Sequence, residues 1–188
     1  MKRFILTGTP GSGKTAILRQ LEFDGFSVVE EAATDVIALW QAGGIAEPWK
    51  DIAFLDAIAT LQRQRQLRAD NAASGTQFHD RSAICTVALA RYMGFPVTDL
   101  LGRELERIKS ESIFQRRVFF VRNLGFVAPT EARRISYEEA LRFEQIHEDT
   151  YREFGFEIVP IEPASLADRV SRIKALAEEA CVPVRLIT

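Results

Sequence analysis

The chain has 188 residues, of which 47% are hydrophobic and 27% charged, as is ordinary for a globular protein with one packed core. A net charge of −2 gives no electrostatic argument for binding nucleic acid or an acidic membrane surface. The longest uncharged apolar stretch, Ala83 to Ala90, is far shorter than the ~20 residues of a membrane-spanning helix. We therefore expect one cytoplasmic domain over residues 1–188, with no nucleic acid and no membrane as partner.

The first predicted strand, residues 3–7, runs directly into a phosphate-binding loop. This loop matches the pattern G-x-x-x-x-G-K-[ST] and consists of Gly8, Thr9, Pro10, Gly11, Ser12, Gly13, Lys14 and Thr15. Its glycines let the backbone approach a ligand closely, and its N–H groups point to the N-terminus of the next helix. Lys14 is expected to contact the β and γ phosphates, and the Thr15 hydroxyl to bind Mg²⁺. A glycine-rich turn without a ligand is the alternative, but the preceding strand and the following amphipathic stretch favour the phosphate site.

Strand-like and helix-like segments alternate along the rest of the chain. Further short apolar segments typical of buried strands cover residues 27–30, 76–80, 117–122 and 157–161. Helices are predicted at 14–21, 33–41, 51–73, 82–93, 98–109, 136–153 and 168–180. The helix at 51–73 turns polar beyond Leu61, so its second half is expected to reach into solvent. This alternation predicts an α/β fold with a parallel sheet covered on both faces, where ligands bind at the carboxyl ends of the strands.

Two adjacent carboxylates, Glu30 and Glu31, stand at the predicted end of the second strand. One of them could hold a metal-bound water or accept a proton from a substrate hydroxyl. Alternatively, both simply begin the next helix, where acidic side chains are favourable. Because neighbouring strand residues point to opposite faces, we expect only one to serve the site. Glu31 is the candidate catalytic carboxylate, and Glu30 is a candidate substrate ligand.

The third predicted strand ends in His79-Asp80-Arg81-Ser82. Asp80 stands where phosphate-loop enzymes carry a carboxylate near Mg²⁺, which makes it a candidate metal ligand and catalytic residue. Arg81 could neutralise a phosphate with its planar guanidinium, and it is a candidate substrate ligand. The alternative is that Asp80 or Ser82 only caps the following helix. His79 is expected to pack within the sheet layer.

A loop-like segment at about 123–136 separates the fourth strand from the next helix, and it ends in Arg133 and Arg134. Such a segment could form a short lid that brings either arginine to the charge that develops during phosphoryl transfer. A solvated basic turn is the alternative. Between Trp40 and Trp49, residues 43–50 could form a wall of an acceptor pocket, although both tryptophans could equally pack in the core.

Three motifs also match the pattern of a known family. The pattern FxLTGxPGxGKT matches residues 4–15, a VVxEAA-like strand end matches 28–33, and FxDR-S matches 78–82. With these motifs the whole chain resembles a family of AAA-type domains similar to the ribosylnicotinamide kinase domain of a bacterial NAD-biosynthesis regulator. The resemblance implies a three-layer, kinase-like fold with five parallel strands in the order 2-3-1-4-5.

The same resemblance implies binding of MgATP and transfer of its γ-phosphoryl group to a small acceptor. Lys14 and Thr15 would serve the phosphates and Mg²⁺, Asp80 would be the Mg²⁺ or base carboxylate, and the arginines at 133 and 134 would be lid arginines. Thr34 departs from the family pattern, which often has arginine there, so one contact with a substrate phosphate is missing or is supplied by another arginine.

Two other functions compete with a kinase. A regulatory ATPase or GTPase switch would act on a protein or lipid partner, but the N-K-x-D motif of GTPases does not occur in the chain. A mechanical ATPase would ordinarily need a longer chain. We therefore expect an ATP-dependent phosphotransferase with an unidentified small acceptor, such as a nucleoside or a nucleotide.

Overall fold

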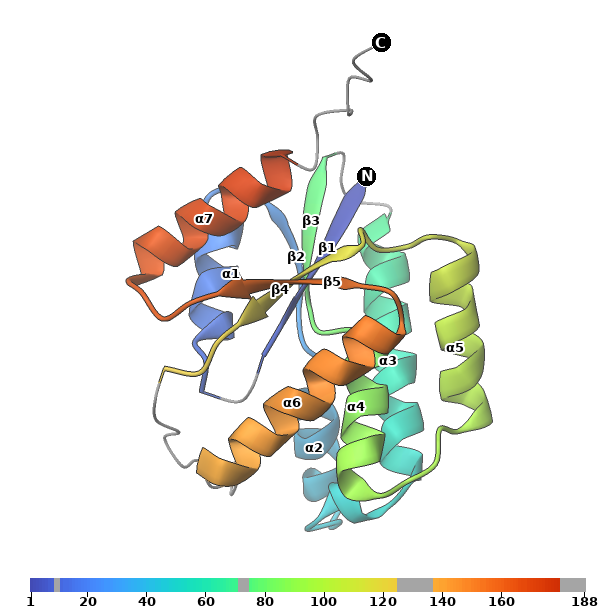
Figure 1. Cartoon of the computed structure of the whole chain (residues 1–188). Coiled ribbons are helices and arrows are strands. Elements are labelled where there is room, and N and C mark those ends of the chain that lie inside the picture. Colours follow the sequence, from blue (N-terminus) through green and yellow to red (C-terminus); the bar gives the residue numbers. More distant parts are fainter. Residues whose placement is uncertain (9–10, 71–74, 125–136, 180–188) are drawn as a thin grey trace.

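Five parallel strands form one sheet in the computed structural model, which describes residues 1–8, 11–70, 75–124 and 137–179. The strands are β1 (Lys2–Thr7), β2 (Ser27–Val29), β3 (Thr76–Asp80), β4 (Arg117–Val121) and β5 (Glu157–Ile161). They lie in the order β2-β3-β1-β4-β5, which confirms the predicted α/β sheet and its strand order (Figure 1). Leu6 of β1 pairs with Asp80 of β3, so the end of β3 lies beside the start of the phosphate loop.

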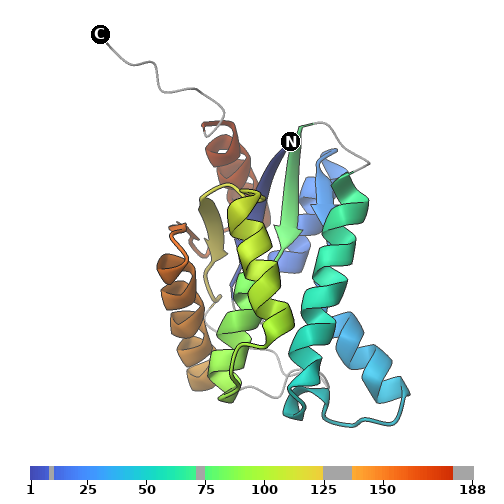
Figure 2. The same cartoon turned by 90° about the vertical axis from the view of Figure 1, so that its right-hand side faces the viewer.

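Helices cover both faces of this sheet. One face carries α1 (Lys14–Phe23) and α7 (Leu166–Glu179). The other carries α3 (Ala53–Asp70), α4 (Ala83–Met93), α5 (Asp99–Ser110) and α6 (Tyr137–Glu153). Beyond the carboxyl ends of the strands, α2 (Ala33–Ala42) and the short helix η1 (Pro48–Lys50) pack on α3 (Figures 1 and 2).

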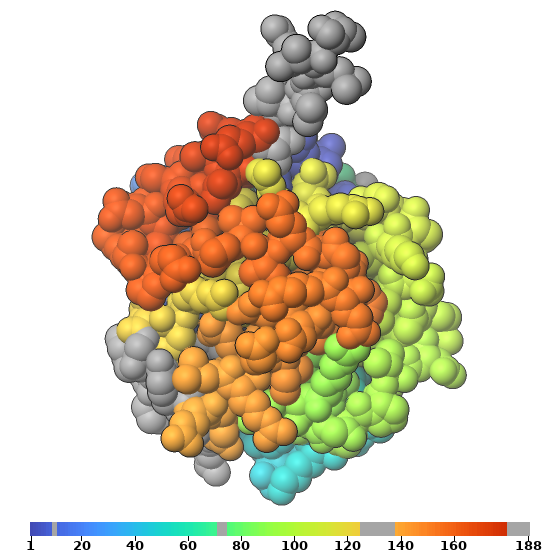
Figure 3. Space-filling model, in the orientation of Figure 1, coloured from blue at the N-terminus to red at the C-terminus, as the bar shows by residue number. Residues whose placement is uncertain are grey.

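The core consists of two apolar layers separated by the sheet. In β1, Phe4 and Leu6 face α1 and α7, whereas Ile5 faces the other helices, as the alternation of a strand requires. All three side chains are fully buried, which explains why β1 is an uninterrupted apolar run. Figure 3 shows α6 and α7 on the face of the molecule turned to the viewer, where β5 forms the edge of the sheet. None of the helices in the described part of the chain combines the length and apolar character that crossing a membrane requires.

The second half of α3 differs from its prediction, because its polar side chains make tertiary contacts instead of only reaching into solvent. Gln66 is buried and accepts a hydrogen bond from Arg107 of α5 at 2.7 Å. Arg65 donates to the backbone oxygen of Glu31 and pairs with Asp35 of α2. The polar half of α3 therefore contacts the segment between β2 and α2 through hydrogen bonds and an ion pair.

Candidate active site

The phosphate loop makes a sharp turn between β1 and α1. Gly8 has a φ of 137°, and a Cβ added there would lie 2.2 Å from the carbonyl oxygen of Val121, so a side chain has no room. Gly13 is the N-cap of α1 with a φ of 84°. Together these glycines place the N-terminus of α1, with its partial positive charge, at the carboxyl edge of the sheet. Thr9 and Pro10 lie outside the described residues.

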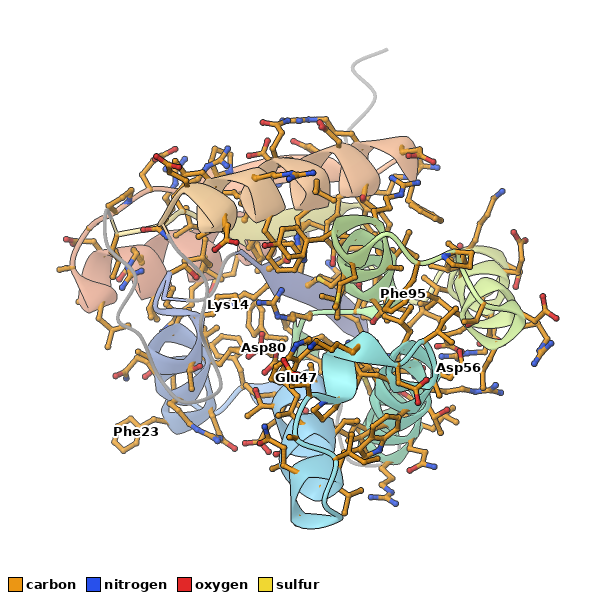
Figure 4. All side chains as sticks on the ribbon, turned by 90° about the horizontal axis from the view of Figure 1, so that it is seen from below. Lys14, Phe23, Glu47, Asp56, Asp80 and Phe95 are labelled. Carbon is orange, nitrogen blue, oxygen red and sulfur yellow. The ribbon has the colours of Figure 1, made fainter. Side chains whose placement is uncertain are left out.

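A cavity of about 210 Å³ opens beside this loop. Its charged and polar lining includes Lys14, Thr15, Glu31, Asp80, Arg81 and His147, which come from five different segments. Its apolar lining includes Ile37, Trp49, Phe54, Ile58, Leu89 and Phe143. Figure 4 views this edge of the sheet, with Lys14 and Asp80 near its centre. The cavity thus joins the phosphate loop to an apolar pocket.

Lys14 is a buried cation at the junction between the loop and the pocket. Burial, and then the neighbouring Arg81, lowers the pKa of Lys14 to about 8, while Asp80 and Glu31 act in the opposite direction. Because little water surrounds it, its attraction for a phosphate group is stronger than that of an exposed lysine.

Arg81 is held in the cavity wall from three sides. Its backbone has a left-handed φ of 69°, and its N–H donates to Leu6 O at 2.9 Å. Its Nε donates to Glu31 Oε1 at 3.1 Å, and its Nη1 lies 3.4 Å from His147 Nε2. Burial opposes the charge of Arg81, but Glu31 and the other acidic neighbours outweigh burial and hold its pKa above the ordinary value. Strained residues of this kind cluster at functional sites.

His147 supports Arg81 as a neutral ring. Burial, and then Arg81, lowers the pKa of His147 to about 3. Its Nδ1 lies 2.9 Å from the carbonyl oxygen of Phe143, one turn earlier in α6, and only a protonated Nδ1 can donate to that oxygen. Nε2 therefore accepts a hydrogen bond from the Arg81 guanidinium.

The two adjacent glutamates diverge after β2. The strand ends at Val29, one residue earlier than predicted, so both carboxylates lie in the turn before α2. Glu31 lines the cavity, whereas Glu30 is exposed and pairs with Arg19 of α1 on the outside. The role of Glu30 as a substrate ligand stays a prediction, and this placement does not favour it.

The other predicted residues are a helix cap, two tryptophans and two lid arginines. Ser82 occupies the N-cap position of α4, but its hydroxyl lies 2.8 Å from that of Tyr151 and makes no capping hydrogen bond. Trp49 lines the cavity. Trp40 packs against Phe54, with the centres of the two rings 6.0 Å apart. Arg133, Arg134 and the predicted lid beyond residue 124 lie outside the described residues.

A comparison with protein families shows which family the chain belongs to. Residues 3–169 match the model of the family described as AAA domain. The chain belongs to this AAA domain family. No curated protein sequence matches it.

Solved structures show the fold that this AAA domain shares. The NadR protein in complex with NAD and AMP-PNP has a TM-score of 0.67 and 19% identity, over 100% of this chain and 51% of that one. Deoxyadenosine kinase from M. mycoides, with products dCMP and dCDP, has a TM-score of 0.60 and 13% identity, over 94% of this chain and 99% of that one. The same kinase with dATP gives 0.57 and 12%, with the same coverage. The chain, which spans about half the NadR chain, therefore shares its fold with these proteins and carries the phosphate loop at the end of β1.

Thr15 and Asp80 are the residues of this AAA domain that fit a Mg²⁺ ion. One hydroxyl and one carboxylate beside a phosphate loop suit an ion that binds few protein ligands and takes the rest from substrate phosphates and water. In the described part of the chain, no group of three or more His, Cys, Asp or Glu side chains could hold a metal without such help.

His147 and Gln62 are cavity residues that sequence reasoning missed. Both lie inside helices, far from any strand end or motif. The available signal was a polar side chain on an otherwise apolar helix face, such as His147 four residues after Phe143. That signal alone does not separate a site from a buried hydrogen bond.

Proposed function

We propose that this protein is a kinase that transfers the γ-phosphoryl group of ATP, with Mg²⁺, to a hydroxyl group of a small, uncharged, nucleoside-like acceptor. The observation that carries the proposal is the single cavity in which Lys14 of the phosphate loop and Glu31 face a common apolar pocket. A hydrolase or switch needs the loop but has no use for such a pocket beside it.

The charged residues divide the work of phosphoryl transfer between them. This reaction depends mainly on positioning and on neutralising charge. Lys14 neutralises the β and γ phosphates, and Arg81 neutralises the group in transfer. The oxygen of the acceptor hydroxyl bonds to the γ phosphorus, while the bond between the γ phosphorus and the β–γ bridging oxygen breaks. Glu31 accepts the proton that this hydroxyl loses. Mg²⁺, held by Thr15 and Asp80, would supply further positive charge at the phosphates.

The lid arginines remain part of the proposal. Arg133 and Arg134 would add positive charge over the transferred group if the predicted lid closes over the nucleotide.

The pocket lining supports an acceptor without a phosphate of its own. Among the described lining residues, the cations are Lys14 and Arg81, and both are assigned here to the phosphates of ATP. No further cation there can neutralise an acceptor phosphate, and Thr34 occupies the position where related domains often have arginine. Aromatic side chains at Trp49, Phe54 and Phe143, with the Gln62 amide, suit a planar ring that carries polar edges.

Transfer of labelled phosphate from ATP tests this function. The protein would be incubated with MgATP and separate panels of nucleosides, nucleoside monophosphates and vitamin-like alcohols, with Lys14→Ala as the inactive control. We expect ADP release that depends on a nucleoside or a similar neutral alcohol, with the label on its hydroxyl group. Turnover that ignores every acceptor, or that rises only with a protein or with lipid vesicles, would instead support a regulatory switch.

A further inference from the structure

A buried arginine from the last helix lies directly behind the phosphate loop. Arg169, in the first turn of α7, is only 6% exposed, and its Nη1 donates to the backbone oxygen of Ser12 at 2.8 Å. A Cβ added to Gly13 would lie 3.0 Å from Nη2 of Arg169, so the guanidinium packs against this glycine. Arg169 therefore contacts the two loop residues that immediately precede Lys14.

The charge of Arg169 is not compensated within the described part of the chain. None of the ion pairs between described residues includes it, and its Nε is buried without a hydrogen-bond partner. It also lies near the N-termini of two helices, α1 and its own α7, where partial positive charge collects. A buried charge in such surroundings is unfavourable unless another group neutralises it.

The contact with Ser12 controls the direction of a neighbouring N–H group. The peptide between Ser12 and Gly13 is planar and trans, so its C=O and N–H point in opposite directions. Because Arg169 binds the Ser12 oxygen from behind the loop, the Gly13 N–H points away from Arg169. In a phosphate loop that is the direction of the bound phosphates.

We propose that Arg169 is a positioning residue for the nucleotide. It fixes the Ser12–Gly13 peptide with its N–H towards the phosphates, and it contributes positive charge that a bound triphosphate neutralises. The inference rests on the nucleotide-binding half of the proposed function and is independent of the acceptor.

Substitutions at Arg169 separate this role from a structural one. Arg169→Met removes both the charge and the hydrogen-bond donor, while Arg169→Lys keeps the charge. Arg172→Met is the matched control, because Arg172 is exposed one turn further along α7. The dissociation constant of AMP-PNP with Mg²⁺ would be measured by calorimetry, and the Tm of each ligand-free protein by thermal unfolding.

We expect Arg169→Met to weaken AMP-PNP binding at least about tenfold, since charge-assisted contacts are among the stronger hydrogen bonds. Its ligand-free Tm should be unchanged or higher, because an unneutralised buried charge is removed. Arg169→Lys should recover most of the affinity, and Arg172→Met should behave as the wild type.

The opposite pattern would overturn the inference. If Arg169→Met lowers the ligand-free Tm but binds AMP-PNP like the wild type, Arg169 is only a structural tie between α7 and the loop. If Arg169→Met does not fold, Arg169→Gln replaces it, because its amide can still donate to Ser12 while the charge is lost. Weaker binding by Arg169→Gln supports the contribution of the Arg169 charge, and unchanged binding overturns that contribution. Failure of the wild type to bind AMP-PNP would overturn both this inference and the proposed function, whereas normal binding without phosphoryl transfer would contradict the proposed function alone.

Discussion

Glu30 and Glu31 are neighbours in the chain, but their carboxylates lie in different surroundings. Glu31 lines the cavity and pairs with the buried Arg81, whereas Glu30 pairs with Arg19 in solvent. We expect Glu31→Gln to lower kcat for phosphorylation of the acceptor by roughly 100-fold or more, because a general base is removed. Glu30→Gln should change it little, since exposed ion pairs contribute little. Steady-state kinetics of both variants checks this, and equal losses would remove the distinction between the two residues.

Gly8 is required by the geometry of the loop. A Cβ at this position would overlap the Val121 carbonyl oxygen, and its φ of 137° is unfavourable for any side chain. We expect Gly8→Ala to lower the free energy of unfolding by about 3 kcal/mol or more. Gly25→Ala is the control, because Gly25 also has a positive φ but open space around it, and it should cost only about 1 kcal/mol. Urea denaturation of both variants measures the difference, and similar costs would show that the loop can shift to accept a side chain.

The residues at strand ends could be located from the sequence, and those inside helices could not. Lys14 and Thr15 complete the phosphate-loop motif that follows β1, and Asp80 ends β3, so the parallel strands bring all three to one edge of the sheet. His147 and Gln62 reach the cavity because α6 and α3 pack across the sheet at particular positions. Those positions depend on contacts between distant parts of the chain, which no local pattern of residues records.

At the scale of elements, Thr98 links two helices. It is the N-cap of α5, where its hydroxyl oxygen accepts a hydrogen bond from Leu101 N at 3.2 Å, and it donates to the Asp56 carboxylate of α3. Thr98→Ala removes both interactions, so we expect a loss of about 1–2 kcal/mol in the free energy of unfolding. Thr98→Ser keeps the hydroxyl and should retain most of the stability in the same urea titration. A loss in the serine variant as large as in the alanine variant would mean that the Thr98 methyl group, and not the cap, is responsible.

The strands were easier to predict than the surroundings of the helices. Predicted and observed strand ranges differ by at most one residue at either end, because a strand covered on both faces must be a short continuous apolar run. The polar half of α3 shows the limit of such reasoning. Its residues look solvent-exposed by composition, yet Arg65 and Gln66 find partners on the β2–α2 connection and on α5.

At the scale of the whole molecule, the alternation of strands and helices predicted a parallel sheet, but the strand order came from the family resemblance. Hydrophobic periodicity places each element in a layer and does not say which strands are neighbours. The order β2-β3-β1-β4-β5 puts β3 and β4 on either side of β1. The end of β3, with Asp80 and Arg81, thereby lies next to the phosphate loop.

The two histidines of the chain make the stability of the whole fold depend on pH. Burial and then Arg3 lower the pKa of His79 to about 3, and burial and then Arg81 lower that of His147 to about 3, with Lys14 acting in the same direction. Both rings are therefore neutral in the folded protein near pH 5. In the unfolded chain both have the ordinary pKa of about 6.5 and bind protons as the pH falls below that value. The unfolded state then binds more protons than the folded state, so the contribution of the histidines to the free energy of unfolding decreases as the pH is lowered through 6.5. Above about pH 7.5 both rings are neutral in either state, and this contribution is constant.

This linkage predicts a loss of roughly 2 kcal/mol per histidine between pH 7.5 and pH 5, a window that lies above the ordinary pKa of most carboxylates. Urea denaturation at the two pH values measures the total for the wild type. His147→Gln removes one titrating group, so it should roughly halve the change with pH while also lowering the stability at pH 7.5. If the wild type is equally stable at both pH values, the histidines are not held neutral, and His147 cannot accept a hydrogen bond from Arg81. The guanidinium of Arg81 would then still be held by Glu31, but α6 would have no part in orienting it.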